Sequence, residues 1–236
     1  MMTEMETLDF KLEINEMAKA GLHFGHSVSK VHPKMLPYLA GVRNAIHIID
    51  LEKTKEKLEE ALKFIYHLVK ENKIILFVGT KIQVRDLVKE IALTTGFPYV
   101  NQRWLGGTFT NFDVIRKRVE YMKELELKLK DPQIRSKYTK KEINLLKEKL
   151  EKLKLKFDGI RNLERIPDAI FVIDMVRDYL AIKEARKKGV KVVAISDSNS
   201  NPTLADYFIP ANDDAIFSVK YILDKVKEAI LRAKGK

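Results

Sequence analysis

The segment KIILFVGT, residues 73–80, is an unbroken apolar run that ends in a glycine and a threonine. Such a run is typical of a strand that is buried on both faces, as the strands of a parallel sheet are. The segments DAIFVID (168–174) and VKVVAIS (190–196) have the same character. They predict two more buried strands.

Helical patterns separate these runs. Residues 53–72 form an amphipathic pattern whose apolar stripe is Leu58, Leu62, Ile65 and Val69. Further helices are expected at residues 82–95, 176–189 and 213–234, and shorter strands at residues 45–50, 97–101 and 206–210. Gly189 should end its helix in a left-handed conformation, and the acidic start of the last helix suits the helix dipole. Because parallel strands need crossover helices, the alternation predicts an α/β fold with a doubly wound parallel sheet.

Residues 109–158 break this rhythm, because they carry no strand signal. Two helical patterns place apolar residues at alternating three- and four-residue spacing, Ile115, Val119, Met122, Leu125 and Leu129 in the first and Ile143, Leu146, Leu150, Leu153 and Phe157 in the second. Thr139 and Glu142 form a capping box, and residues 131–138, with Pro132, mark the reversal. We expect an inserted antiparallel coiled-coil hairpin about 30 Å long, at roughly 1.5 Å per residue.

The domain boundaries follow from this break. We expect residues 1–108 and 159–236 to form one discontinuous α/β domain, residues 109–158 to form the hairpin, and residues 1–19 to be an acidic N-terminal extension.

The charge of the chain points to a polyanionic partner. The 236 residues carry 44 Lys and Arg against 33 Asp and Glu, a net charge of +11. The hairpin alone has 15 Lys and Arg against 9 Asp and Glu. Nucleic acid is the simplest partner, and a merely lysine-rich protein is the alternative.

The same composition excludes several classes of protein. Without cysteine there are no disulfides, thiolate zinc sites or cysteine nucleophiles. The apolar runs are far shorter than a membrane span, so no membrane is expected as a partner. The N-terminus lacks the apolar core of a signal peptide, so we expect the protein to act in the compartment where it is made.

Enzymatic chemistry is not visible. Gly79 stands alone before Thr80 and Lys81, without the glycine fingerprint or P-loop that a nucleotide site requires. Two of the histidines, His23 and His26, could combine with Asp174 and Asp197 into a metal site or an acid–base pair, but structural or base-stacking roles are favoured. We therefore expect no catalytic residue, no cofactor and no metal, with a nucleotide-binding enzyme as the alternative.

Two segments carry the donors that RNA binding needs. Residues 23–49 hold Lys30, His32, Lys34 and Arg43 in a glycine- and proline-punctuated stretch, which is too irregular to predict an element of its own. The second segment, NQRWLGGTFTNF (101–112), should be the joint before the hairpin. Gly106 and Gly107 would let the backbone turn, and Thr108 or Thr110 would cap the helix. Trp104 would pack the joint or present a flat face to RNA.

Six blocks of the sequence resemble the S-two family of bacterial and organellar small-subunit ribosomal proteins. In chain order they are AGLHFGHSVSKVHPKMLPYLAGVRNAIHIIDLEKT, ILFVGTK, VNQRWLGGTFTNF, PDAIFVID, AIKEARKKGVKVVAISDSNSNP and DYFIPANDDAIFSV. The resemblance covers residues 20–233. It implies a flavodoxin-like domain with a coiled-coil hairpin, and a structural role on the small subunit with rRNA contacts near the head–body junction.

The resemblance also implies partners and a location. It implies neighbouring small-subunit proteins, and a docking platform for the first small-subunit ribosomal protein where an organism has one. A homo-oligomer is not expected. The location would be the ribosome in the bacterial cytoplasm or, alternatively, in the plastid stroma.

The expected site residues follow from the residue pattern and from the family resemblance. The expected RNA-binding residues are His23, His26, Lys30, His32, Lys34, Arg43, Asn44, Thr80, Lys81, Arg103, Trp104, Thr110, Asn111, Arg116 and Lys117. Gly106 and Gly107 are the expected hinge. Two residues depart from the family pattern, since His32 stands where Asn is usual and Asn201 stands where Asp usually precedes Pro202.

Overall fold

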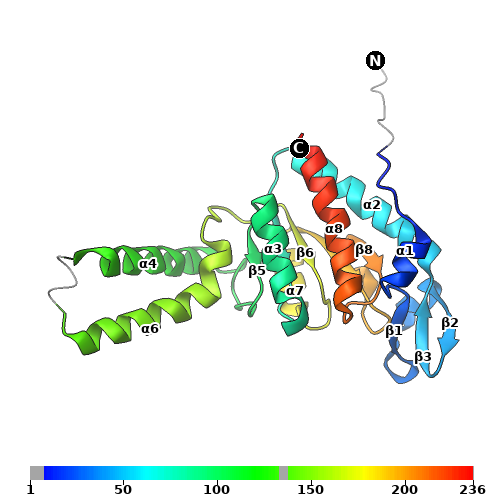
Figure 1. Cartoon of the computed structure of the whole chain (residues 1–236), viewed down its shortest axis with the longest axis horizontal. Helices are drawn as coiled ribbons and strands as arrows, with labels where there is room; N and C mark the ends of the chain where they lie inside the picture. The colour runs from blue at the N-terminus through cyan, green and yellow to red at the C-terminus, as the bar shows by residue number, and fades with distance from the viewer. Residues whose placement is uncertain (1–7, 133–137, 236) are drawn as a thin grey trace, which may run out of the picture.

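A five-stranded parallel sheet forms the centre of the protein. The computed structural model describes residues 8–132 and 138–235 (Figure 1). The strands lie in the order β5-β4-β6-β7-β8. Their bounds are β4 Ile75–Val78, β5 Tyr99–Val100, β6 Ala169–Val172, β7 Lys191–Ser196 and β8 Tyr207–Pro210. The order reverses direction at β4, which is the property of a doubly wound sheet. The predicted parallel α/β architecture is therefore confirmed.

Helices cover both faces of this sheet. One face packs against α2 (Leu51–Lys70), α3 (Arg85–Thr95) and α8 (Ile216–Ala233). The other face packs against α7 (Tyr179–Lys187) and the start of the hairpin. All four residues of β4 and all four of β6 are buried, which explains why both segments read as unbroken apolar runs.

The hairpin consists of α4 (Phe112–Lys130) and α6 (Lys140–Phe157), which project side by side from one end of the sheet (Figure 1). The predicted capping box is confirmed, with Thr139 and Glu142 bonding reciprocally. The reversal predicted at residues 131–138 falls mostly on residues 133–137, outside the described residues. The buried seam residues are Ile115, Val119, Met122, Leu125, Leu150 and Phe157. They belong to the same hydrophobic cluster as one face of the sheet, so the root of the arm packs against that face.

The segment at residues 23–49 does form an element of its own, contrary to the sequence-based expectation. It folds into a three-stranded antiparallel sheet, the small sheet, in the order β1-β3-β2. Its strands are β1 Phe24–Ser27, β2 Leu39–Arg43 and β3 Ile46–Ile49. The strand expected at residues 45–50 is thus β3, and it does not join the parallel sheet. A two-residue turn, Asn44 and Ala45, connects β2 to β3 with φ values of 50° and 59°.

The remaining elements are short. Helix α1 (Ile14–Lys19) lies in the N-terminal extension. Short 3-10 helices occupy Val28–Lys30, Pro33–Tyr38, Ile82–Val84, Asp158–Ile160 and Pro202–Leu204. Gly189 follows α7 at φ 70°, as predicted. The last helix begins at Ile216, later than expected, so Asp213 and Asp214 lie before it rather than in its first turn.

Candidate nucleic-acid interface

The expected RNA-binding residues divide by exposure. Nine are exposed: Lys30, Lys34, Arg43, Asn44, Arg103, Thr110, Asn111, Arg116 and Lys117. Four are half-buried: His23, His26, His32 and Lys81. Thr80 and Trp104 are buried, so neither has a surface that RNA can reach.

Lys81 lies at the carboxyl edge of the parallel sheet among three carboxylates. Its ammonium group is 3.3 Å from Asp174 and 3.0 Å from Asp213, and it also pairs with Asp214. Burial and the nearby carboxylates of Asp174 and Asp197 raise the pKa of Asp213. Because acids outnumber the cation here, Lys81 is already compensated within the chain and offers little attraction to a phosphate.

Thr80 has an internal role next to this cluster. Its hydroxyl donates to Asp178 at 2.8 Å, and its backbone N–H donates to the same carboxylate at 3.1 Å. Burial raises the pKa of Asp178, while these hydrogen bonds from Thr80 oppose the rise. The pair ties the loop after β4 to the start of α7.

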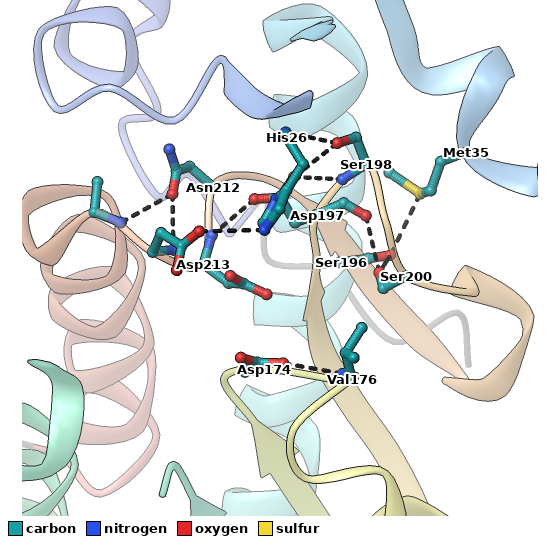
Figure 2. A network of polar contacts seen from close by, with 12 residues as sticks. His26, Met35, Asp174, Val176, Ser196, Asp197, Ser198, Ser200, Asn212 and Asp213 are labelled. Carbon is teal, nitrogen blue, oxygen red and sulfur yellow. Dashed lines mark hydrogen bonds and ion pairs between the residues drawn. The ribbon is translucent and has the colours of Figure 1, made fainter. Parts of the chain in front are cut away.

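His26 joins the small sheet to the parallel sheet (Figure 2). Its Nδ1 is 3.1 Å from Asp197, its Nε2 is 3.3 Å from Asp214, and its backbone N–H donates to Ser198 at 2.8 Å. The hydrogen bond to Asp197 raises the pKa of His26, although burial opposes it. Ligand atoms of His26, Asp197 and Asp214 lie within 4.8 Å of one another and could hold a metal ion. His23 and Asp174, the other two residues considered for such a site, are not in this group.

The loop before β2 is also held internally. His32 Nδ1 accepts from the backbone N–H of Lys34 at 3.2 Å, so the imidazole caps the 3-10 helix that follows. The Lys34 ammonium donates to Thr203 Oγ1 at 3.1 Å. Asn44 has a conformational reason to be present, since left-handed φ values suit Asn.

One face of the small sheet is open and carries three apolar side chains and one cation. Strand pairing places Phe24 opposite Ile48 and Arg43 opposite Ile46, all on the face away from the buried His47 and Ile49. Phe24 is 46% exposed and Ile46 is 38% exposed.

The joint before the hairpin is organised around one carboxylate, that of Glu184 on α7. Its Oε1 accepts from Gly107 N at 2.7 Å and from Trp104 Nε1 at 3.4 Å. Its Oε2 accepts from Phe109 N at 2.9 Å and from Thr110 N and Oγ1 at 3.2 and 3.3 Å. Burial disfavours the charged form, but the hydrogen bonds from Phe109, Gly107 and Thr110 prevail and lower the pKa of Glu184.

These contacts resolve the alternatives left open for the joint. Trp104 is 6% exposed and packs edge-on against Phe109, so it fills the joint. Gly107 has φ 92°, which favours glycine, whereas a Cβ at Gly106 would meet only Leu180 at 3.8 Å. The expected threonine cap is wrong. Asn111 precedes the first helical residue without a side-chain cap, and Thr110 bonds to Glu184 instead.

The segment that follows α6, at the end of the hairpin, is anchored separately. A Cβ at Gly159 would lie 2.1 Å from the carbonyl oxygen of Tyr99, so only glycine fits against β5. Glu126 on α4 pairs with Arg161 just beyond the hairpin and with Lys154 on α6 at 3.4 Å. The hydrogen bond from Arg161 lowers the pKa of Glu126 to about 2, against the effect of burial.

Sequence reasoning missed three residues that organise these joints, Glu184, Asp178 and Gly159. Glu184 resembles an ordinary exposed glutamate in a charged helix, AIKEARKK. Its position was a usable signal, because it lies three residues after Ala181 and beside Ala185, both on the buried stripe of α7. Asp178 and Gly159 had no comparable signal.

Comparison with known proteins places the chain in a family. Residues 17–233 match the family model described as ribosomal protein S2. The small ribosomal subunit protein uS2 of Thermus thermophilus is 45% identical over 225 residues, covering 95% of this chain and 88% of the relative. The protein of the same name from Dictyoglomus thermophilum is 48% identical over 221 residues, covering 94% and 89%. Among the described residues, no helix combines the length and apolar character needed to cross a membrane.

Proposed function

The chain belongs to the ribosomal protein S2 family, and from this premise we propose that it binds small-subunit rRNA through two groups of exposed cations. Members of the family are structural proteins of the small ribosomal subunit and not enzymes, so the alternative of a nucleotide-binding enzyme is withdrawn. The chain therefore has a structural role in the ribosome.

The first group of cations lies at the root of the hairpin. Arg103, Arg116 and Lys117 are exposed there, beside the polar side chains of Thr110 and Asn111. Arg116 pairs with Glu120 at 3.1 Å, but a pair between two exposed side chains is weak enough to be exchanged for a phosphate. The second group, Lys30, Lys34 and Arg43, belongs to the small sheet and its loops.

The observation that carries the proposal is that contacts within the chain hold both groups to the central sheet. Glu184 and the shared hydrophobic cluster hold the hairpin root, and His26 with Asp197 holds the small sheet. Phosphate contacts position a protein on RNA only if the donors keep their register. The body would thus present two fixed sets of donors to folded rRNA near the head–body junction.

Binding to deproteinised rRNA from bacterial small subunits tests this proposal. The logarithm of the binding constant should fall linearly with the logarithm of salt concentration, by about 0.7 to 0.9 per phosphate neutralised. Replacing Arg103, Arg116 and Lys117 with Gln should reduce that slope by about 2 to 3. Salt-insensitive binding by the wild-type chain, or its absence from purified small subunits, would refute the proposal.

Docking of the first small-subunit ribosomal protein is a second part of the proposal. The open apolar face of the small sheet, with Phe24 and Ile46, is the surface that favours it, because exposed apolar groups rimmed by polar residues mark protein contacts. Phe24→Ser should reduce retention of that protein on salt-washed subunits while leaving rRNA binding unchanged. Equal retention by both chains would remove this part.

The remaining elements of the proposal concern organisation and place. Residues 109–158 would act as a coiled-coil arm on a flavodoxin-like body, residues 1–108 and 159–236. The protein would work as a single copy among neighbouring small-subunit proteins. Its bacterial relatives favour the ribosome of a bacterial cytoplasm, with the plastid stroma as the alternative.

A further inference from the structure

We propose that the outer face of α7 is a phosphate-binding surface that joins the two cation groups described above into one continuous RNA track. The inference rests on the proposed function and extends it to residues outside both groups. Lys183, Arg186 and Lys187 are exposed on α7, and Arg186 and Lys187 follow Lys183 by three and four residues, so both lie on the same side of the helix as Lys183.

The inner side of α7 contacts the root of the hairpin. Glu184 receives the backbone N–H groups of Gly107, Phe109 and Thr110. Leu180 reaches to within 3.8 Å of the position that a Cβ on Gly106 would occupy. The first half of α7 is therefore adjacent to the segment that carries Arg103 and Arg116.

The other end of α7 reaches the loop that carries Lys34. The Arg186 guanidinium donates to the carbonyl oxygen of Thr203 at 3.0 Å, and the Lys34 ammonium donates to the hydroxyl of the same residue at 3.1 Å. Two cations from distant parts of the sequence thus meet on Thr203. A hollow of about 230 Å³ opens beside them, with Arg186 and Lys191 on its wall.

The charge of this surface is not balanced within the chain. Residues 183–191 contain the cations Lys183, Arg186, Lys187, Lys188 and Lys191. The one acid of this stretch, Glu184, is 5% exposed and faces inward. Lys191 pairs with Asp206 at 2.8 Å. Of the other four cations, none has a carboxylate within ion-pairing distance among residues 8–132 and 138–235.

Helix electrostatics alone do not explain the pattern. Cations at the end of a helix complement its dipole, which accounts for Lys187 and the C-cap residue Lys188 and contributes at Arg186. Lys183 lies before the last turn, and the Arg186 guanidinium is directed to Thr203, outside α7. A run of exposed cations whose one intervening acid, Glu184, is buried fits a phosphate backbone better than a protein surface, where exposed charges of both signs are mixed.

A matched pair of triple variants tests the inference on the full-length chain. The test variant is Lys183→Gln, Arg186→Gln, Lys187→Gln. The control is Lys63→Gln, Lys220→Gln, Lys227→Gln, which makes the same change in net charge on α2 and α8, on the opposite face of the sheet. The probe is deproteinised rRNA from bacterial small subunits. Loss of two to three phosphate contacts should weaken binding on the order of 100-fold at 0.1 M salt, and the curves should converge near 1 M salt. The control should bind within a few-fold of wild type.

Several results would overturn the inference. Wild-type affinity in the test variant, or an equal loss in both variants, would show that α7 makes no specific contact. Normal rRNA binding with poor incorporation into subunits would point to an acidic protein as the partner instead. If the test variant has a lowered thermal midpoint, Lys183→Glu, which spares the last turn of α7, replaces it with the same expected direction.

The two proposals fail in different ways. If the wild-type chain does not bind the rRNA, the proposed function falls and this inference falls with it. If the Arg103, Arg116 and Lys117 variant binds weakly while the α7 variant binds normally, only the inference is wrong.

Discussion

Replacing Glu184 with Gln exchanges one oxygen for an NH2 group, and we expect it to lower the free energy of unfolding by weakening the hydrogen bonds at the hairpin root. The carboxylate accepts from three backbone N–H groups, those of Gly107, Phe109 and Thr110, and from Trp104 Nε1. Gln has only one acceptor oxygen on its side chain. In either orientation of the amide, its NH2 group must face at least one of these backbone donors.

The size of the effect follows from these contacts. The best orientation keeps the oxygen on Phe109 and Thr110 and leaves Gly107 N and Trp104 Nε1 unpaired. The loss at Gly107 N costs about 1–3 kcal/mol, and the 3.4 Å contact of Trp104 adds little to it. Each remaining bond loses its charge assistance, roughly 1 kcal/mol apiece. We expect a total loss of about 3–5 kcal/mol in the free energy of unfolding, a large part of the usual ~5–15 kcal/mol.

Denaturant unfolding measures this loss, with Glu148→Gln as the control. Glu148 is an exposed glutamate on α6, so the same change in charge should alter stability by no more than about 0.5 kcal/mol. Hydrogen exchange should also accelerate at the amides of Gly107 and Phe109. A Glu184→Gln chain within about 1 kcal/mol of wild type, with unchanged exchange at these amides, would refute the reasoning.

Acid provides an independent check on the same residue. The pKa of Glu184 is lowered in the folded state from an ordinary value of 4.5, so its contribution is complete above that value. The contribution is lost as the pH falls through the folded-state pKa. The stability difference between wild type and Glu184→Gln should therefore shrink as the pH is lowered from about 5. A difference that stays constant to acid unfolding would argue against a charged Glu184.

Three further predictions concern the same arm. Gly107→Val places a β-branched residue at φ 92°, so it should destabilise the joint by about 1–3 kcal/mol. It should also lower incorporation into subunits, as measured on sucrose gradients. Normal incorporation would exclude a hinge role for Gly107. Gly159→Ala should displace β5, because its methyl group overlaps the carbonyl of Tyr99, and a thermal midpoint equal to that of wild type would contradict this. Glu126, with its pKa at about 2, should stabilise the arm down to low pH through Arg161. The Glu126→Gln variant should therefore be less stable than wild type at pH 7 but differ little from it at pH 2. Equal losses of stability at the two pH values would contradict this.

The central sheet was predictable because its signal is local. A strand buried on both faces must be apolar at every position, and β4 and β6 show this directly in their sequences. The capping box at Thr139 was predictable for the same reason, since its two partners are three residues apart.

The small sheet and the joints were not predictable in this way. Strand β2 is interrupted by Gly41 and its side chains are mostly exposed, so no period-2 pattern marks it. The roles of Thr80 and Glu184 depend on partners 98 and 77 residues away. No local pattern reports such distances, and a polar residue at a core position is the one hint that the sequence offers.

The pairing of His26 with the carboxylates of Asp197 and Asp214 has a consequence for the order of events during synthesis of the chain. The small sheet is near the start of the chain, whereas both acids are in its last fifth. During synthesis, at about 5–20 residues per second, the N-terminal strands emerge long before the partners that hold them. A nascent chain would thus lack a fixed binding surface until its C-terminal helix has left the exit tunnel. Under the proposed function, capture by rRNA would then select finished molecules over truncated ones.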